Sequence, residues 1–112
     1  MKPGRLNIDD EKAGARFTLG VNLCDEEGTA VDLTGYTGAF KIRYRAASPN
    51  VLLEASTANG RLTLGGTPFN AVVDCDLAIA PGRYEYDLAV FSADGHKWPM
   101  LTGRFEVEAS AV

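Results

Sequence analysis

The stretch that decides the fold covers residues 31–45 and reads VDLTGYTGAFKIRYR. Its second half alternates two kinds of side chain, Phe40, Ile42 and Tyr44 on one face and Lys41, Arg43 and Arg45 on the other. Period-2 alternation in aromatic and β-branched company is typical of a half-buried strand in an antiparallel sheet. Its first half, residues 32–36, is rich in turn-forming residues. The stretch therefore predicts a turn that leads into a strand whose apolar face lies on the core.

Length and composition fit a single globular domain. The chain has 112 residues, of which 46% are hydrophobic and 23% charged, and both fractions are ordinary for such a domain. Twelve glycines and five prolines, spread between short apolar runs, favour an all-β chain with many turns. A net charge of −4 and a pI near 4.9 argue against nucleic acid as the main partner, because phosphate binding needs a basic surface.

The sequence predicts no membrane-spanning or secretory segment. A spanning helix needs about 20 apolar residues in a row, and no run in this sequence approaches that length. The first 14 residues, MKPGRLNIDDEKAG, lack the apolar core of a signal peptide. We therefore expect synthesis in the cytoplasm and no membrane partner.

Short strand-like segments recur along the chain at spacings near ten residues. They cover residues 16–23, 40–45, 51–55, 61–64, 70–77 and 83–92, followed by a final strand that ends at residue 107. Asn59-Gly60, between two of these segments, predicts a hairpin. The pattern predicts an all-β fold, an immunoglobulin-like antiparallel β-sandwich of seven to nine strands over residues 15–109.

The pairing of the last two strands is predicted residue by residue from Asp94-Gly95, a two-residue turn signal. A turn centred there gives the inward pairs Tyr84–Phe105, Tyr86–Gly103 and Leu88–Leu101. The outward pairs are Glu85–Arg104, Asp87–Thr102, Ala89–Met100 and Phe91–Trp98. Each pair is sterically or electrostatically favourable, and the glycine leaves room for the ring of Tyr86. Pro99, opposite Val90, predicts a local bulge.

Residues 1–14 form a polar arm ahead of the predicted domain. The arm contains Pro3, Gly4 and an acidic run, residues 9–11. Leu6 and Ile8 alternate with polar residues, which permits a short edge strand. Two further interpretations stay open, a frayed terminus and an arm that docks on a partner.

The two cysteines are predicted to be free thiols. In the strand over residues 16–23 the apolar face leaves Cys24 pointing outward, whereas Cys75 shares an inward face with Val73 and Leu77. One outward and one inward cysteine do not form an inter-sheet disulfide, so a reducing compartment is the better interpretation.

With these elements placed, the chain resembles a family of small immunoglobulin-like domains in tailed bacteriophages, which includes the N-terminal domain of baseplate upper proteins. The matching segments are residues 14–19 (GARFTL), 25–37 (DEEGTAVDLTGYT), 41–43 (KIR), 59–64 (NGRLTL), 81–88 (PGRYEYDL) and 103–107 (GRFEV). The most distinctive piece is Asp-Leu-Thr-Gly-Tyr at residues 32–36. The resemblance spans residues 14–108 and implies a non-enzymatic structural component of the virion. The chain departs from many relatives at residues 77–80, where the connection before Pro-Gly-x-Tyr is short.

Two surface features are candidate interaction sites. Phe91, Trp98 and Met100 are predicted to cluster on the outer face of the last hairpin, and exposed apolar patches of this kind mark interfaces. The alternative is that the arm or a loop covers them. The basic stripe Lys41, Arg43 and Arg45 is the second feature, and we expect Glu85 and Asp87 on the neighbouring strand to neutralise it locally.

No residue pattern predicts catalysis, a cofactor or a metal site. His96 is the only histidine, and no Cys-x-x-Cys, His-x-His or Gly-x-Ser-x-Gly motif accompanies it. Asp74 and Asp76 alternate outward on one strand, which is ordinary for a solvated face although paired carboxylates also serve in glycosidases. The acidic run at residues 25–27 lacks the spacing of a calcium loop and is interpreted as a turn.

Together the residues predict a binding protein rather than an enzyme. By resemblance, it is a structural protein of a tailed phage, made in the host cytoplasm and assembled into the virion at the tail, baseplate or head. It would contact other phage structural proteins and further copies of itself. The alternative function is a carbohydrate-binding module for host surface glycans, with Phe91, Trp98, Asp74 and Asp76 as its platform.

Overall fold

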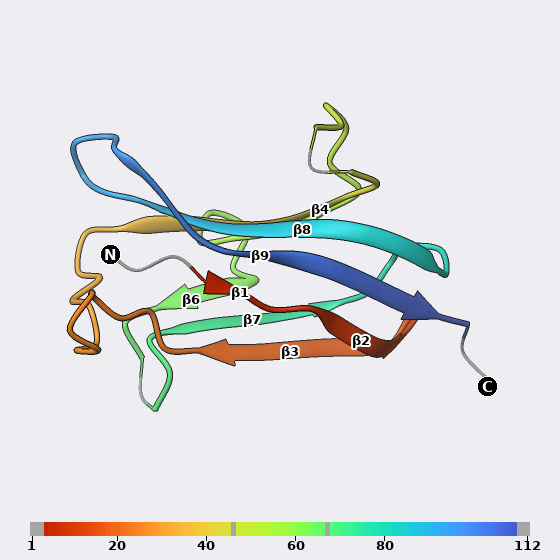
Figure 1. Ribbon diagram of the computed structural model, residues 1–112, viewed down its shortest axis with the longest axis horizontal. Coiled ribbons are helices and arrows are strands. Elements are labelled where there is room, and N and C mark those ends of the chain that lie inside the picture. The colour runs from red at the N-terminus through yellow and green to blue at the C-terminus, as the bar shows by residue number, and fades with distance from the viewer. Residues whose placement is uncertain (1–3, 46, 67, 110–112) are drawn as a thin grey trace.

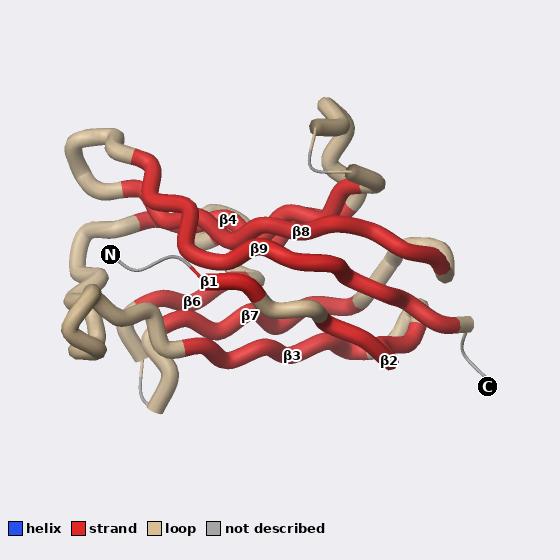
Figure 2. Tube along the Cα trace, viewed as in Figure 1, coloured by secondary structure: helices blue, strands red, loops and turns tan. Residues whose placement is uncertain are grey.

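The chain folds as two β-sheets packed face to face, as seen in a computed structural model that describes residues 4–45, 47–66 and 68–109 (Figure 1). The described residues form nine strands and no helix (Figure 2). One sheet has six strands, which are β1 (Gly4–Arg5), β2 (Ile8–Lys12), β4 (Thr37–Arg43), β5 (Leu53–Ser56), β8 (Gly82–Phe91) and β9 (Lys97–Glu108). The other has three, which are β3 (Arg16–Val21), β6 (Leu62–Leu64) and β7 (Ala71–Asp76). The predicted all-β sandwich is confirmed.

The larger sheet has the strand order β1–β9–β8–β4–β5, and β2 lies on the same edge of β9 as β1. The smaller sheet has the order β3–β7–β6. All pairings are antiparallel except those of β1 and β2, which run parallel to β9. Side chains from both sheets and the loops fill the space between them. The largest fully buried ones are Phe40, Ile42, Val73, Leu77, Leu88, Val90 and Phe105.

The stretch at residues 31–45 forms the predicted turn and central strand. Asp32 accepts hydrogen bonds from the backbone N–H and hydroxyl of Thr34, at 3.0 and 2.7 Å, which closes an Asx turn. Gly35 follows with a φ of 81°, a left-handed conformation that glycine adopts without strain. Strand β4 then lies between β8 and β5. We predicted that Tyr44 faces the core, but Tyr44 is 56% exposed because β4 ends at Arg43.

The predicted pairing of β8 with β9 holds from Tyr84–Phe105 to Leu88–Leu101. Nearer the turn the register shifts by one residue, so Ala89 pairs with Pro99 and Phe91 with Lys97. Ser92 N–H donates to the carbonyl of His96, which leaves a three-residue loop with Gly95 at a φ of 89° in place of the predicted two-residue turn. The extra residue of β9 is absorbed in a bulge next to Leu88. A bulge was predicted from Pro99, but its effect on the register was not.

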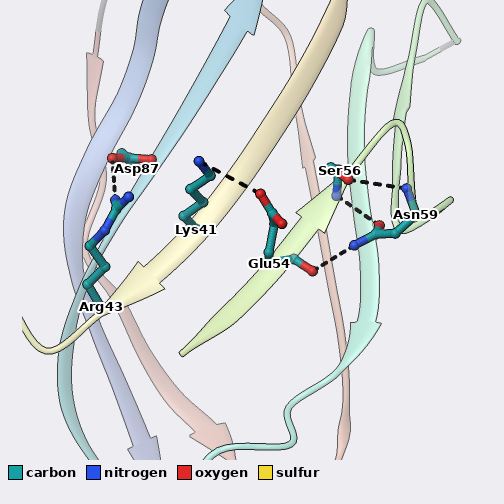
Figure 3. Close-up of polar contacts among 6 residues, drawn as sticks. All are labelled: Lys41, Arg43, Glu54, Ser56, Asn59 and Asp87. Atoms are coloured by element: carbon teal, nitrogen blue, oxygen red, sulfur yellow. Dashed lines mark hydrogen bonds and ion pairs between the residues drawn. The ribbon is translucent and has the colours of Figure 1, made fainter. Parts of the chain in front are cut away.

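The hairpin predicted at Asn59-Gly60 does not form. Strand β5 pairs with β4 in the larger sheet, whereas β6 pairs with β7 in the smaller one. Asn59 instead braces a crossing between the sheets, because its side chain accepts from Ser56 N–H at 2.9 Å and donates to the Glu54 carbonyl at 3.0 Å (Figure 3). Gly60 has a φ of 78°. The dipeptide marks a tight turn correctly, but strand pairing decides which sheet each neighbour joins.

The arm lies along the open edge of β9 (Figure 1). Gly4 and Arg5 pair with Leu101 and Thr102, and β2 continues the pairing after an interruption at residues 6–7. Part of the arm is therefore a short edge strand of its own chain, one of the interpretations left open. Residues 1–3, including Pro3, lie outside the described residues.

Candidate interaction surface

The three residues predicted to form an outer apolar cluster do not come together. Met100 is 2% exposed and belongs to the core, because the bulge turns its side chain inward. Trp98 pairs with Val90, whose side chain faces the core, so Trp98 is on the inner face of the sheet. Phe91 lies on the outer face beside Ala89 and Lys97. The prediction of one cluster was wrong because the register shift moves Trp98 and Met100 away from Phe91.

An apolar groove lies between the end of β3 and the start of β9. Its volume is about 390 Å³, and its lining includes Gly4, Gly20, Val21, Leu23, Phe69, Met100 and Leu101. Phe69 is 41% exposed, and Trp98, two residues before Met100 on the inner face, is 39% exposed. Large exposed apolar side chains beside a groove present an unusually apolar surface to solvent.

Phe69 is the residue of this groove that sequence reasoning missed. A Cβ on Gly20 would lie 2.5 Å from the Phe69 ring, so only glycine lets that ring lie against β3. A glycine inside a predicted strand signals such a close approach. The signal was present at Gly20, but the sequence alone does not say which side chain approaches it.

The basic stripe is neutralised in part, and Arg43 uses one of the predicted acidic partners. Strand β4 pairs with β8, so Arg43 reaches Asp87 at 3.2 Å (Figure 3). Lys41 lies 3.8 Å from Glu54 of β5, an acidic partner that was not predicted. Arg45, past the end of β4, donates to the Tyr44 carbonyl at 2.7 Å. Two of the three cations therefore face carboxylates within the sheet, and the stripe is not a free basic surface.

The polar residues considered for chemistry lie apart from one another. Asp74 faces outward and takes two hydrogen bonds from Arg16, at 2.8 and 2.6 Å, which hold the pKa of the Asp74 carboxyl below its usual value. His96 is an exposed residue of the hairpin loop, 3.6 Å from Asp94. Strand β7 runs toward the end of the sandwich opposite that loop (Figure 1), and Asp74 lies in its second half. Neither carboxylate of β7 is near the histidine.

Both cysteines are free, as predicted. Cys75 is 7% exposed, and burial raises the pKa of its thiol. It borders a hollow of about 450 Å³ whose lining includes Arg16, Arg61, Asp74 and Asp76. A buried, protonated thiol in this position is a poor nucleophile.

The arm is seated in a socket formed by Tyr86 and Gly103 of the paired strands β8 and β9. The hydroxyl of Tyr86 donates to the carbonyl of Leu6 at 2.6 Å. A Cβ on Gly103 would lie 1.8 Å from that carbonyl oxygen, so the arm passes through space that only glycine leaves open. Asn7 accepts from the backbone N–H of Arg104 at 3.0 Å. Burial raises the pKa of Tyr86 to about 12, so its hydroxyl is a donor at neutral pH.

Among the described residues, no group of three or more His, Cys, Asp or Glu side chains is placed to hold a metal ion. The described part of the chain also contains no helix long and apolar enough to cross a membrane. Comparison with family models, with curated proteins and with solved structures finds no match for this chain.

Proposed function

We propose that the chain is a non-enzymatic structural protein of a tailed bacteriophage virion. It works through protein–protein contacts, with further copies of itself and with other phage structural proteins in the tail, the baseplate or the head. It is made in the host cytoplasm and carried into the particle. The phage assignment rests on the resemblance over residues 14–108, and the contact mechanism rests on the geometry of the groove.

An immunoglobulin-like topology is part of this proposal, and the strand order supports it. With β3 as strand B and the later strands taken in turn, the small sheet has the order B-E-D and the large sheet G-F-C-C′. Tyr84, at the start of β8, donates from its hydroxyl to the carbonyl of Ala80 four residues upstream. A tyrosine bonded in this way at the start of strand F is the tyrosine corner of immunoglobulin-like domains.

An aromatic cluster takes the place of the inter-sheet disulfide that antibody domains carry in their core. Phe17 of the small sheet meets Phe105 of the large sheet at 5.1 Å between ring centroids, with the rings nearly perpendicular. Phe40 and Tyr86 lie 5.2 Å apart within the large sheet. Edge-to-face and tilted aromatic contacts each add about 1 kcal/mol beyond the buried area. Such a core holds the two sheets without a disulfide, which suits synthesis and assembly in a reducing cytoplasm.

The observation that carries the contact mechanism is the exposure of Phe69, which lines the groove, and of Trp98, which lies two residues before the groove residue Met100. Aromatic side chains are enriched at the centres of protein interfaces. Trp98 is the only tryptophan in the chain, so its fluorescence reports directly on this surface. We therefore assign the groove, which includes Phe69, together with Trp98 as the contact surface between copies.

The test is the molar mass of the purified chain in solution, measured by light scattering over a concentration series. We expect masses of two or more times 12.0 kDa at the higher concentrations. The Trp98 emission shifts to the blue as the mass rises. Trp98→Lys and Phe69→Lys reduce the mass to that of one chain. Val51→Lys is the matched control, since Val51 is 38% exposed but lies next to β5, at the other edge of the large sheet from β1 and β9. A mass of 12.0 kDa at every concentration would contradict the proposal.

The carbohydrate-binding alternative has no platform built from the residues predicted for it. Phe91 and Trp98 lie on opposite faces of the large sheet. Asp74 and Asp76 lie on β7, near the end of the sandwich away from the hairpin tip. Sugar recognition needs an exposed aromatic ring with polar groups around it, and this set does not meet that need. We do not propose it as the function.

A further inference from the structure

We propose that the edge of β9 that faces away from β8 is an acceptor site for the N-terminal arm of a second copy of this chain. In the structure the arm of the same chain fills the site, so the occupant is already known in chemical detail. This inference rests on the proposed function, because it names one contact by which copies assemble. Exchange of an identical element between copies keeps every contact of the closed form and adds a link.

The acceptor site recognises backbone rather than particular side chains. Leu6 donates from its N–H to the carbonyl of Thr102 at 2.9 Å and accepts from the hydroxyl of Tyr86 at 2.6 Å. Gly103 leaves the space that the Leu6 carbonyl occupies. These groups bind an arm equally well whether it belongs to the same chain or to another.

The arm shares little of the hydrophobic core, so its release is less costly than unfolding. Among the arm residues whose burial is described, only Ile8 belongs to the buried core, while Gly4, Arg5 and Leu6 are exposed. The ion pairs that it makes with β9 join exposed groups, Arg104 with Asp9 and Lys12 with Glu108. Surface pairs of this kind contribute about 0–1 kcal/mol each. Segments with few buried contacts open locally while the rest of a domain stays folded.

The connection between the arm and β3 favours exchange. Ala15 N–H donates to the Lys12 carbonyl at 3.2 Å, so the chain passes from one sheet to the other in a tight turn. Gly14 takes a φ of 77° in that turn. The pairing of β2 with β9 also shifts register between Ile8 and Glu11. Short, constrained hinges of this kind favour domain swapping, because an exchanged arm extends the hinge.

The experiment is disulfide trapping between two singly labelled proteins. Arg5 and Thr102 are register partners on exposed positions of β1 and β9. Neighbouring strands lie about 4.8 Å apart, which is within the Cα separation that a disulfide spans. The R5C and T102C proteins, each also carrying Cys24→Ser, are mixed at high concentration and oxidised. The heterodimer exceeds the level formed by random collision only if the arm of one chain lies on β9 of the other.

We expect the R5C–T102C heterodimer to exceed a collision control by about tenfold or more, since a seated arm holds the thiols at millimolar effective concentration. The control partner is R83C, whose position is exposed and has β9 as its neighbour but lies away from β1. Adding Gly103→Ala to the T102C partner removes the excess, because it blocks the seat of the arm.

Heterodimer no more abundant than the control overturns the exchange. A single chain carrying both cysteines then shows where the arm lies: closure within the chain means that the arm stays on its own β9. If the molar mass is still two or more times 12.0 kDa, the groove contact stands and only the exchange fails. If the mass is 12.0 kDa throughout, both proposals fail.

Discussion

Replacing Gly103 with alanine tests how the arm is held on β9. The added Cβ would lie 1.8 Å from the Leu6 carbonyl oxygen and 2.7 Å from the carbonyl carbon, so the backbone of the arm has to move. Displacement breaks three hydrogen bonds, those of Leu6 N–H, the Tyr86 hydroxyl and the Asn7 side chain. At about 1 kcal/mol for each bond, the free energy of unfolding falls by ~3 kcal/mol. Urea denaturation, followed by circular dichroism, measures the change.

Gly4→Ala is the matched control, because its Cβ would lie 3.6 Å from the Leu101 side chain, an ordinary contact distance. We expect a change within about 0.5 kcal/mol. Tyr86→Phe removes a hydrogen bond to the same Leu6 carbonyl. The double variant therefore loses less unfolding free energy than the two single variants lose together. A loss under about 1 kcal/mol for Gly103→Ala, or strict additivity with Tyr86→Phe, would refute the socket.

Three further predictions concern the core and the titrating groups. Asn70→Ala lowers the free energy of unfolding by about 2–3 kcal/mol, since the buried Asn70 side chain bonds both the N–H and the carbonyl of Leu23, at 2.7 and 2.8 Å. The control, Asn50→Ala at an exposed position, changes the free energy of unfolding by less than ~0.5 kcal/mol. Similar losses in the two variants would contradict the structural role of Asn70. Burial raises the pKa of Tyr86 from 10.0 to about 12, so the stability that Tyr86 contributes is complete below pH 10 and is lost as the pH rises toward 12. In alkaline unfolding experiments, the free energy of unfolding of Tyr86→Phe depends less on pH in that window. The same pH dependence in both proteins would count against the burial of Tyr86. Cys24 reacts with a thiol reagent ~10-fold faster than Cys75 in the native protein, because burial shields the Cys75 thiol and raises its pKa; equal rates, read by mass spectrometry, would show that the core opens readily.

Local patterns predicted the large sheet well where strands pair across many residues. Alternation placed Phe40 and Ile42 on the core, and it paired Tyr84 with Phe105 correctly. Each of these predictions rests on the period of two that a half-buried strand imposes. The same alternation failed at Tyr44 because a pattern continues past the residue where hydrogen bonding stops.

The candidate site was less predictable because it depends on one residue of register. The turn signal at Asp94-Gly95 is compatible with loops of two or three residues, and the two choices put Trp98 on opposite faces. The sequence alone does not show which arrangement has the lower free energy, a two-residue loop or a three-residue loop with a compensating bulge. The groove itself joins β3 to β9, and the arm socket joins Leu6 to Tyr86. Contacts between residues so far apart in the chain leave no local periodicity to detect.

We propose that this chain is a component of a phage particle, held there by contacts with other structural proteins. Quantitative mass spectrometry of purified particles from the strain that encodes the chain tests it most directly. We expect the chain in every particle preparation, at a fixed number of copies relative to the major capsid protein. Particles that lack the chain, with all of it left in the soluble lysate, would show that it is not a structural protein of the virion.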